Sequence, residues 1–362
     1  MEFLTVLVLA LAFSNSLGPT TPGTEVHANH PFNYVVVIVM ENQGLGDIIN
    51  NTSAPFMNQL ASSYAVAINY TAVNHPSLPN YLSLISGQDF ASWSKADCNP
   101  SPRCSAGNAS NIVDSLENRG LSWKAYMEDY PSSCGSQCSP GNCFLGNTGT
   151  SGYVARHNPF VYFDDIVNST SRCSRIVPAN SRGKGGPDNL LLSDLASPST
   201  ASNFMWLTPN LCNDMHDCPV STGDTYLSQV VPNILNSTLF THQKAALFVT
   251  FDEGNGYCPL NRSSHDCVYA VWAGPLVKTN FRSSNQYSHY SFLNTLETVW
   301  KLPLLTNNDR NAIPMTEFFV HPAHGGHGEH EASDDEHGKP TVEDHQHRES
   351  HEVCKVCQLF SD

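Results

Sequence analysis

Two runs of apolar residues constrain the fold of this chain more than any other feature. Residues 34–40 have the sequence YVVVIVM, and residues 246–251 have the sequence ALFVTF. Neither run alternates with polar residues, which is typical of strands that are buried on both faces of a parallel sheet. Further apolar runs at 122–127, 204–207 and 267–272 are separated by helical or loop-rich stretches. The pattern predicts an α/β fold with a mostly parallel central sheet between layers of helices.

Polar side chains follow directly after the two strongest runs. Glu41 and Asn42 follow the first run, and Asp252 and Glu253 follow the second. Side chains just past the carboxyl ends of parallel strands converge in one crevice, so these four are expected to meet. Carboxylate and amide oxygens are the ligands that hard divalent cations prefer. Either pair alone is more simply explained as the polar end of a strand, but together they predict a site for one divalent cation (Ca, Mg, Mn or Zn).

Ser77 precedes an apolar stretch at 82–86, and Pro79 follows it two residues later. This arrangement predicts a helix with Ser77 as its N-cap and Pro79 in its first turn. Capping is the commoner role for such a serine. The same position also suits a nucleophile, because free N–H groups and the helix dipole favour an incoming phosphate there. The residues by themselves leave both interpretations open.

The N-terminus and the cysteines predict a secreted protein. Residues 3–13 are apolar and lead to Ser16-Leu17-Gly18, so residues 1–18 are expected to be a signal peptide, followed by a Pro- and Thr-rich leader at 19–31. Twelve cysteines are present, and the pairs Cys98/Cys104, Cys212/Cys218 and Cys258/Cys267 lack the spacing of zinc knuckles, so disulfides are expected. Glycosylation sequons begin at Asn50, Asn51, Asn69, Asn108, Asn168, Asn236 and Asn261. No segment after the signal peptide is expected to span a membrane.

The remaining composition defines the domain boundaries and excludes one class of partner. A formal net charge of −15 and the absence of a Lys/Arg run argue against nucleic-acid binding. We expect one domain at 32–320, with a cysteine-rich insertion near 92–152 and a loop-like stretch at 172–200. Residues 321–362 contain half of the histidines and few apolar residues, which predicts a disordered tail. A metal-binding role for the tail, with Cys354 and Cys357, stays an alternative.

Seven short motifs in a fixed order resemble those of a known family. They are Met40-Glu41-Asn42, Ser77-Leu78-Pro79-Asn80, Tyr126-Met127-Glu128-Asp129, His157-Asn158-Pro159-Phe160, PNLCNDMHD at 209–217, Phe251-Asp252-Glu253-Gly254 and His289-Tyr290-Ser291. Their order and spacing resemble the phosphoesterase family of secreted acid phosphatases and bacterial phospholipases C, a branch of the alkaline phosphatase superfamily. The resemblance covers residues 33–300 and implies a three-layer α/β/α sandwich.

The resemblance also implies roles for individual residues. Ser77 matches the nucleophile, and the four strand-end residues match the ligands of one metal ion, although the family often has Asp where this chain has Glu253. Asn80 is expected to contact the phosphoryl group, and one of the histidines is expected to protonate the leaving group. The catalytic histidines are expected to be His216 and His289, and the remaining substrate-binding residues His157, Asp217 and His75.

The function predicted from these features is phosphoester hydrolysis through a phosphoseryl intermediate. The favoured reaction is that of an acid phosphatase on small phosphomonoesters, and the nearest alternative is a phospholipase C acting on lipid phosphodiesters. An alternative of another class is a secreted metal-binding glycoprotein with an inactive site.

Overall fold

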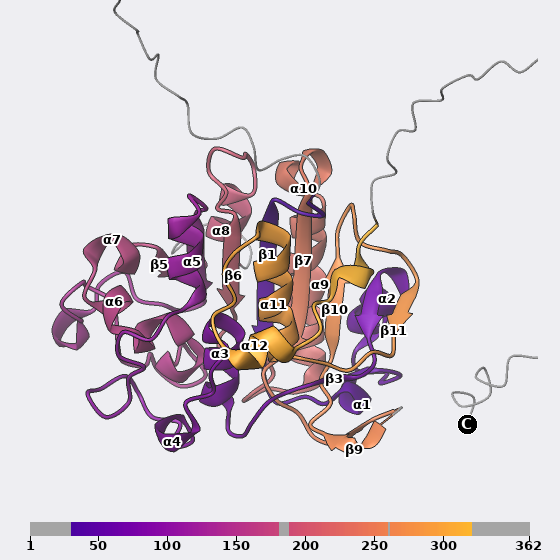
Figure 1. Ribbon diagram of the computed structural model, residues 1–362, viewed down its shortest axis with the longest axis horizontal. Helices are drawn as coiled ribbons and strands as arrows, with labels where there is room; N and C mark the ends of the chain where they lie inside the picture. The colour runs from indigo at the N-terminus through magenta and orange to yellow at the C-terminus, as the bar shows by residue number, and fades with distance from the viewer. Residues whose placement is uncertain (1–29, 181–187, 260, 321–362) are drawn as a thin grey trace, which may run out of the picture. The chain divides into compact units, whose positions relative to one another are not determined.

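The computed structural model describes residues 30–180, 188–259 and 261–320 (Figure 1). The expected signal peptide, most of the leader and the histidine-rich tail therefore lie outside the described residues.

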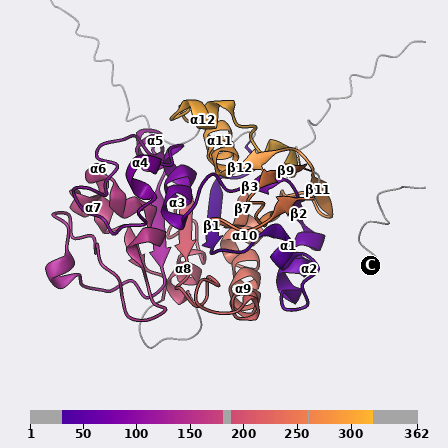
Figure 2. The same cartoon turned by 90° about the horizontal axis from the view of Figure 1, so that it is seen from below.

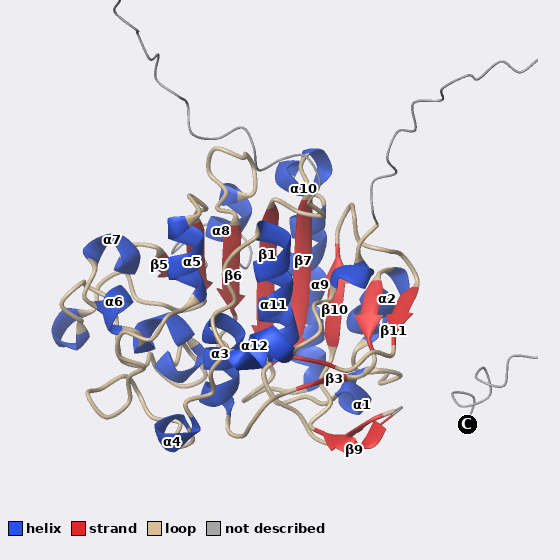
Figure 3. Cartoon of the chain, viewed as in Figure 1, coloured by secondary structure: helices blue, strands red, loops and turns tan. Residues whose placement is uncertain are grey.

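An eight-stranded sheet forms the centre of the fold, in the order β11-β2-β10-β7-β1-β6-β4-β5 (Figure 3). Its strands are β1 (Tyr34–Met40), β2 (Ala65–Ala67), β4 (Trp123–Met127), β5 (Ile176–Pro178), β6 (Phe204–Thr208), β7 (Ala245–Phe251), β10 (Ala270–Ala273) and β11 (Phe281–Ser283). β1 pairs in parallel with β7 on one side and β6 on the other, and β4 continues the parallel pairing to β5. β10 runs antiparallel to both β7 and β2. The prediction of a mostly parallel sheet is confirmed.

Helices cover both faces of this sheet, as the two orthogonal views show (Figures 1 and 2). On one face lie α3 (Ser77–Ser86), α5 (Ile112–Asn118), α11 (His289–Trp300) and α12 (Asn307–Asn311), and on the other lie α2 (Pro55–Ser63), α8 (Asn189–Asp194) and α9 (Val220–Leu235). The predicted three-layer arrangement is therefore present. Shorter helices are α1 (Leu45–Ile48), α4 (Ala91–Ser94), α6 (Asp164–Val167), α7 (Thr170–Cys173), α10 (Thr238–His242) and the 3-10 turns Gly135–Gln137, Ala155–His157, Pro159–Tyr162 and Thr316–Phe318. Two small ribbons pair β3 (Tyr70–Thr71) with β12 (Tyr287–Ser288) and β8 (Tyr257–Cys258) with β9 (Asn261–His265).

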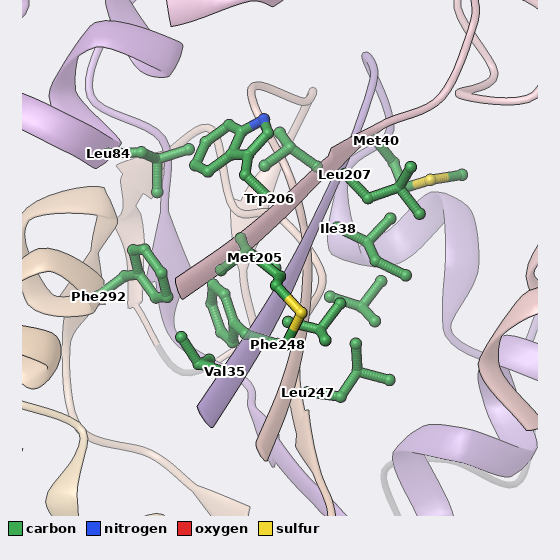
Figure 4. Close-up of a cluster of buried hydrophobic side chains, with 14 of the residues drawn as sticks. Val35, Ile38, Met40, Leu84, Met205, Trp206, Leu207, Leu247, Phe248 and Phe292 are labelled. Carbon is green, nitrogen blue, oxygen red and sulfur yellow. The ribbon is translucent and has the colours of Figure 1, made fainter. Parts of the chain in front are cut away.

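The apolar runs form the core because both faces of the central strands are covered. Residues 35–40 of β1 are fully buried. Figure 4 shows Val35 of β1 on the side of the sheet where Phe292 of α11 and Leu84 of α3 lie, and Ile38 of β1 on the other side, near Leu247 of β7. Burying a side chain of this size contributes roughly 1.5–3 kcal/mol, so the continuous apolar pattern is what holds the sheet between its helices.

Two regions differ from the sequence-based expectation. The stretch 172–200, expected to be loop-like, contains β5 and α8. Both elements are short, and β5 lies at the edge of the sheet. Such short segments leave little hydrophobic periodicity to detect in the sequence. The cysteine-rich stretch 92–152 contains α5 and β4 of the sandwich, and its loops lie before and after these two elements.

Five disulfides are present in the described residues. They are Cys98–Cys104, Cys134–Cys138, Cys143–Cys173, Cys212–Cys218 and Cys258–Cys267. The three pairs expected from spacing are confirmed. Of the helices in the described part of the chain, none combines the length and the apolar character that crossing a bilayer requires.

Candidate active site

The carboxyl ends of β1 and β7 bring the two acidic pairs together. Met40 and Phe251 are register partners in adjacent parallel strands, so Glu41 and Asp252 leave the sheet side by side. Both are fully buried. The half-buried Asn42 has a left-handed backbone with φ 58°, and its N–H donates to Asp252 Oδ1 over 3.2 Å. The turn after β1 therefore fixes the orientation of the carboxylate after β7.

Ser77 faces this carboxylate pair and does not cap its helix. α3 begins at Ser77 itself, the N-cap is Pro76, and no side chain caps the helix. The N-cap interpretation is therefore wrong. A residue at the first helical position has its side chain free of the capping geometry, and the Ser77 hydroxyl donates to Glu41 Oε2 over 3.0 Å. The serine is buried with 4 % exposure, next to a carboxylate that can accept its proton.

Asp214 completes a cluster of three buried carboxylates. It lies in the loop after β6 that the Cys212–Cys218 disulfide closes, and its backbone carbonyl accepts the Glu41 N–H over 2.8 Å. His157 lies between them, with Nε2 3.1 Å from Glu41 Oε1 and Nδ1 3.4 Å from Asp214 Oδ2. Neither contact has the geometry of a hydrogen bond. The ring of Tyr81 stacks on the imidazole, with centroids 5.2 Å apart and an interplanar angle of 6°.

The electrostatics of this cluster are unbalanced. Burial first, and then the neighbouring acids, raise the pKa values of Glu41, Asp214 and Asp252 well above their usual range. Burial, followed by the charge of Arg156, holds the pKa of His157 well below its usual value, so its imidazole is neutral. Across the described residues no Lys or Arg forms an ion pair with any of the three acids. Each carboxylate leaves one buried oxygen without a hydrogen-bond partner: Glu41 Oε1, Asp214 Oδ2 and Asp252 Oδ2.

The residues present fit a bound cation. Buried, unpartnered carboxylate oxygens are costly unless a counter-charge satisfies them. Glu41, His157 and His216 bring one ligand atom each within 4.8 Å of one another, which adds imidazole nitrogens to the oxygen ligands expected from the sequence. Glu41 therefore belongs both to the oxygen ligands predicted from the sequence and to this group of one carboxylate and two imidazoles. The two histidines were not predicted as ligands because neither follows one of the two strongest apolar runs.

Glu253, Asn80 and His75 form a second group beside the cluster. His75 is 54 % exposed, and its Nδ1 lies 2.9 Å from Glu253 Oε2. Burial is the main reason that the pKa of Glu253 rises to about 8, and the charge of Asp266 adds to it. Asn80 uses its Oδ1 to accept the N–H groups of Val73 and of the residue after it, and its Nδ2 donates to the same loop. The amide predicted to contact the phosphoryl group therefore holds the loop that precedes Ser77.

His289 supports Asp252 from inside the fold. Its Nε2 lies 2.5 Å from the backbone oxygen of Asp252, and its Nδ1 lies 3.1 Å from the Tyr70 hydroxyl. Burial lowers its pKa to about 4, so the ring is neutral at ordinary pH. With both nitrogens on protein partners, His289 is placed to position Asp252, and its predicted catalytic role stays a prediction.

His216 and Asp217 lie at the solvent-facing edge of the site. His216 is 28 % exposed, and its Nδ1 lies 2.7 Å from Asp217 Oδ1. Hydrogen bonds from His216 and Ser151 lower the pKa of Asp217, so this carboxylate is charged. A carboxylate on Nδ1 orients the ring and leaves Nε2 directed elsewhere. Nε2 lies 3.4 Å from Nη2 of Arg156.

Some residues of the site were missed in the sequence. Asp214 is in the motif at 209–217, where the sequence-based prediction selected His216 and Asp217 and left Asp214 as an acidic neighbour. Tyr81 had no signal beyond its position after Asn80. Arg156 precedes His157 directly, and a cation beside a predicted site histidine was the signal that could have identified it.

Comparison with known proteins places this site in a family. The sequence profile of the Phosphoesterase family matches residues 47–303. A phosphatidylinositol-3-phosphatase of Mycobacterium tuberculosis (strain ATCC 25618 / H37Rv) is 30 % identical over 297 residues, which cover 82 % of this chain and 86 % of that protein. A probable acid phosphatase of Kluyveromyces lactis is 29 % identical over 285 residues, and an acid phosphatase of Aspergillus fumigatus is 26 % identical over 302 residues. These matches cover 78 % and 82 % of this chain but 61 % of each fungal protein.

Among solved structures, a 2-O GAG sulfatase shares the fold with a TM-score of 0.50 and 9 % identity, covering 80 % of this chain and 74 % of that one. A protein of the alkaline phosphatase superfamily from Vibrio parahaemolyticus has a TM-score of 0.48 and 12 % identity, covering 75 % of this chain and 68 % of its own. Fold and site together are those of a hydrolase with a serine beside clustered carboxylates. The chain belongs to the phosphoesterase family and is a hydrolase of phosphoric ester bonds.

Proposed function

We propose that this protein is a secreted, metal-dependent acid phosphatase that hydrolyses phosphomonoesters through a phosphoseryl intermediate on Ser77. The observation that carries the proposal is the Ser77 hydroxyl, which donates to Glu41 inside a cluster of carboxylates that pair with no Lys or Arg among the described residues. A serine with only a structural role does not need buried carboxylates around its hydroxyl, whereas a nucleophile beside a cation site does.

The residues that would hold a divalent cation are Glu41 and Asp252, with Asn42 and Glu253 from the same two strand ends, and with the imidazole of His157. When bound, such an ion would neutralise charge on the phosphoryl oxygens and lower the pKa of the serine hydroxyl. Oxygen ligands favour Ca²⁺, Mg²⁺ or Mn²⁺, and an imidazole ligand favours Zn²⁺.

The side chains supply the proton transfers of the reaction. Ser77 passes its proton to Glu41 and its Oγ attacks phosphorus, while the departing alkoxide takes a proton from Nε2 of His216. Water then attacks the phosphoserine and returns a proton to His216, and Ser77 leaves with the proton held by Glu41. Asp217 holds Nδ1 of His216. Nε2 faces Nη2 of Arg156, which can only donate, so Nε2 turns away from this guanidinium when it carries the proton.

The names of the relatives support a monoesterase. Two of the proteins described above are named acid phosphatases and one a phosphatidylinositol-3-phosphatase, so a phosphate on a small molecule or on a lipid headgroup is the expected substrate class. None of the three is named a phospholipase. Five disulfides in the described residues support secretion, because disulfides persist in oxidising compartments.

A substrate panel tests the proposal. The purified protein is assayed from pH 4 to pH 8 with p-nitrophenyl phosphate, bis(p-nitrophenyl) phosphate, phosphatidylinositol 3-phosphate and phosphatidylcholine, after chelation and after adding Ca²⁺, Mg²⁺, Mn²⁺ or Zn²⁺. We expect turnover of the monoesters, fastest at acidic pH and dependent on one added ion. Preference for the diesters would support the phospholipase C alternative. No turnover under any condition would contradict the proposal and favour a metal-binding glycoprotein.

A further inference from the structure

A carboxylate of the protein itself lies at the start of the nucleophile's helix. Asp97 Oδ1 accepts the backbone N–H of Leu78 over 3.2 Å. Leu78 follows Ser77, so this N–H belongs to the first turn of α3, where backbone donors have no partner within the helix. Such donors favour anions.

The other oxygen of Asp97 lies beside Arg156. Its Oδ2 is 3.0 Å from Nε of Arg156 in an ion pair without hydrogen-bond geometry, and the two side chains are 27 % and 20 % exposed. The far end of the guanidinium reaches Nε2 of His216 at 3.4 Å. Arg156 thus connects Asp97 to the histidine proposed as proton donor, and it is placed by the turn that also buries His157.

Asp97 contacts both the nucleophile's helix and the arginine beside His216. Its Oδ1 accepts the Leu78 N–H, and its Oδ2 lies beside Nε of Arg156. An anion bound next to Ser77 would meet the same two donors.

We propose that Arg156 is the phosphoryl-binding cation of this site and that Asp97 is an internal surrogate for the phosphoryl group, which the substrate must displace. The inference rests on the proposed function, because it assigns the phosphoryl position next to Ser77. Substrate binding transfers the Leu78 N–H and the guanidinium of Arg156 from Asp97 to phosphoryl oxygens. Asp97 returns to them when phosphate leaves.

The physical basis is competition between two anions for the same donors. A guanidinium binds carboxylate and phosphate through the same fork of N–H groups. The phosphate dianion carries the larger charge and displaces a single carboxylate, but the ion pair with Asp97 must first be broken. Asp97 therefore weakens the binding of substrate and of product alike, and weaker product binding favours turnover.

The first arm of the test measures the affinity for inorganic phosphate by isothermal titration calorimetry with metal-loaded, full-length protein. Arg156→Ala is expected to weaken phosphate binding about 10-fold or more, in the range expected when hydrogen bonds to a charged group are lost. The phosphate affinity of Arg156→Lys is expected to lie between those of the wild type and Arg156→Ala. The ammonium group of lysine keeps the charge but lacks the paired N–H groups of a guanidinium. The matched control is Arg172→Ala, which removes an arginine of similar exposure, 17 %, from carboxylates on α5 and α6.

The second arm uses Asp97→Asn, which keeps an oxygen for the Leu78 N–H and removes the competing charge. We expect phosphate to bind several-fold more tightly and KM for p-nitrophenyl phosphate to fall. The matched control is Asp165→Asn, since Asp165 is the partner of Arg172 and has a side-chain exposure of 25 %. In the double variant with Arg156→Ala, the gain from Asp97→Asn is expected to disappear, because both effects act through one guanidinium.

Three results would overturn the inference: unchanged phosphate affinity in Arg156→Ala, equal or weaker affinity in Asp97→Asn, or additive effects in the double variant. If Asp97 were only a helix cap, Asp97→Asn would lower Tm without tightening phosphate. Failure of the proposed function is distinguishable, because phosphate binding is measured without turnover. A wild-type protein that binds phosphate with this mutational pattern and hydrolyses no monoester would disprove the function and keep the binding assignment.

Discussion

Two groups of buried carboxylates in this protein are similar in charge and differ in their partners. At the end of α11, Glu297 Oε1 accepts the Leu305 N–H over 3.1 Å, and Asp309 accepts the N–H groups of Leu305 and Thr306 over 2.8 Å each. Glu297 Oε2 has no hydrogen-bond partner. Burial, then the charge of Asp309, raises the pKa of Glu297 to about 9, so this carboxyl keeps its proton at neutral pH.

The cluster at the strand ends contains three carboxylates, Glu41, Asp214 and Asp252, and each of them also keeps an unpartnered oxygen. The histidine between them is neutral. Strongly raised pKa values occur in both groups, so the shift alone does not identify the functional site. What separates them is the set of partners: backbone N–H groups at one, and a serine hydroxyl with imidazoles at the other.

Replacing Ser77 tests the difference most directly. Ser77→Ala removes the nucleophile and leaves every carboxylate, so we expect kcat to fall on the order of 10³-fold or more while the cation and phosphate still bind. Steady-state kinetics, metal analysis and phosphate titration on the same preparation provide the measurement. Near wild-type activity would mean that Ser77 is not the nucleophile.

Asp252→Ala should affect binding as well as chemistry. It removes a carboxylate from the proposed cation site, so metal content, phosphate affinity and rate are expected to fall together. Elemental analysis of the purified variant alongside Ser77→Ala compares the two effects. Normal metal content in Asp252→Ala would refute this carboxylate as a ligand, whatever the rate.

His216→Asn separates proton donation from binding. A general acid contributes roughly 10²–10⁴-fold, and its contribution grows as the leaving group becomes more basic. We expect a large loss of kcat/KM with an alkyl phosphate and a much smaller loss with p-nitrophenyl phosphate, whose leaving group needs little protonation. Equal losses on the two substrates would show that His216 acts as a metal or phosphate ligand instead.

Glu297→Gln is expected to leave activity unchanged and to alter the pH dependence of stability. The folded protein keeps the Glu297 proton up to about pH 9, whereas the unfolded chain releases it above its usual pKa of 4.5. The stability from this group is therefore complete below pH 4.5 and is lost as pH rises toward 9. Glutamine keeps an acceptor for Leu305 and a donor for Asp309, so the Tm of the variant relative to wild type should increase between pH 5 and pH 8. A constant difference in Tm would contradict the retained proton.

The sequence by itself determined the sandwich and the meeting of the two strand ends. Continuous apolar runs such as residues 34–40 can be satisfied only where both faces are covered, and residues that follow such parallel strands share one edge. Glu41 and Asp252 could therefore be placed together before any coordinates, and the motif order pointed to the family. The local disulfide Cys212–Cys218 was also predictable, because its cysteines are too close in sequence to be far apart in space.

Only the tertiary structure decided what each polar side chain does. Ser77 could cap its helix or face Glu41, and the choice depends on where β1 ends relative to α3. His289 was predicted only as a catalytic histidine, and the fold shows that its two nitrogens face Asp252 and Tyr70. The ion pair of Arg156 with Asp97 leaves no pattern in the chain. Apolar burial follows the local period of the sequence, whereas hydrogen-bond and ion-pair partners come from distant segments whose positions are set by the packed fold.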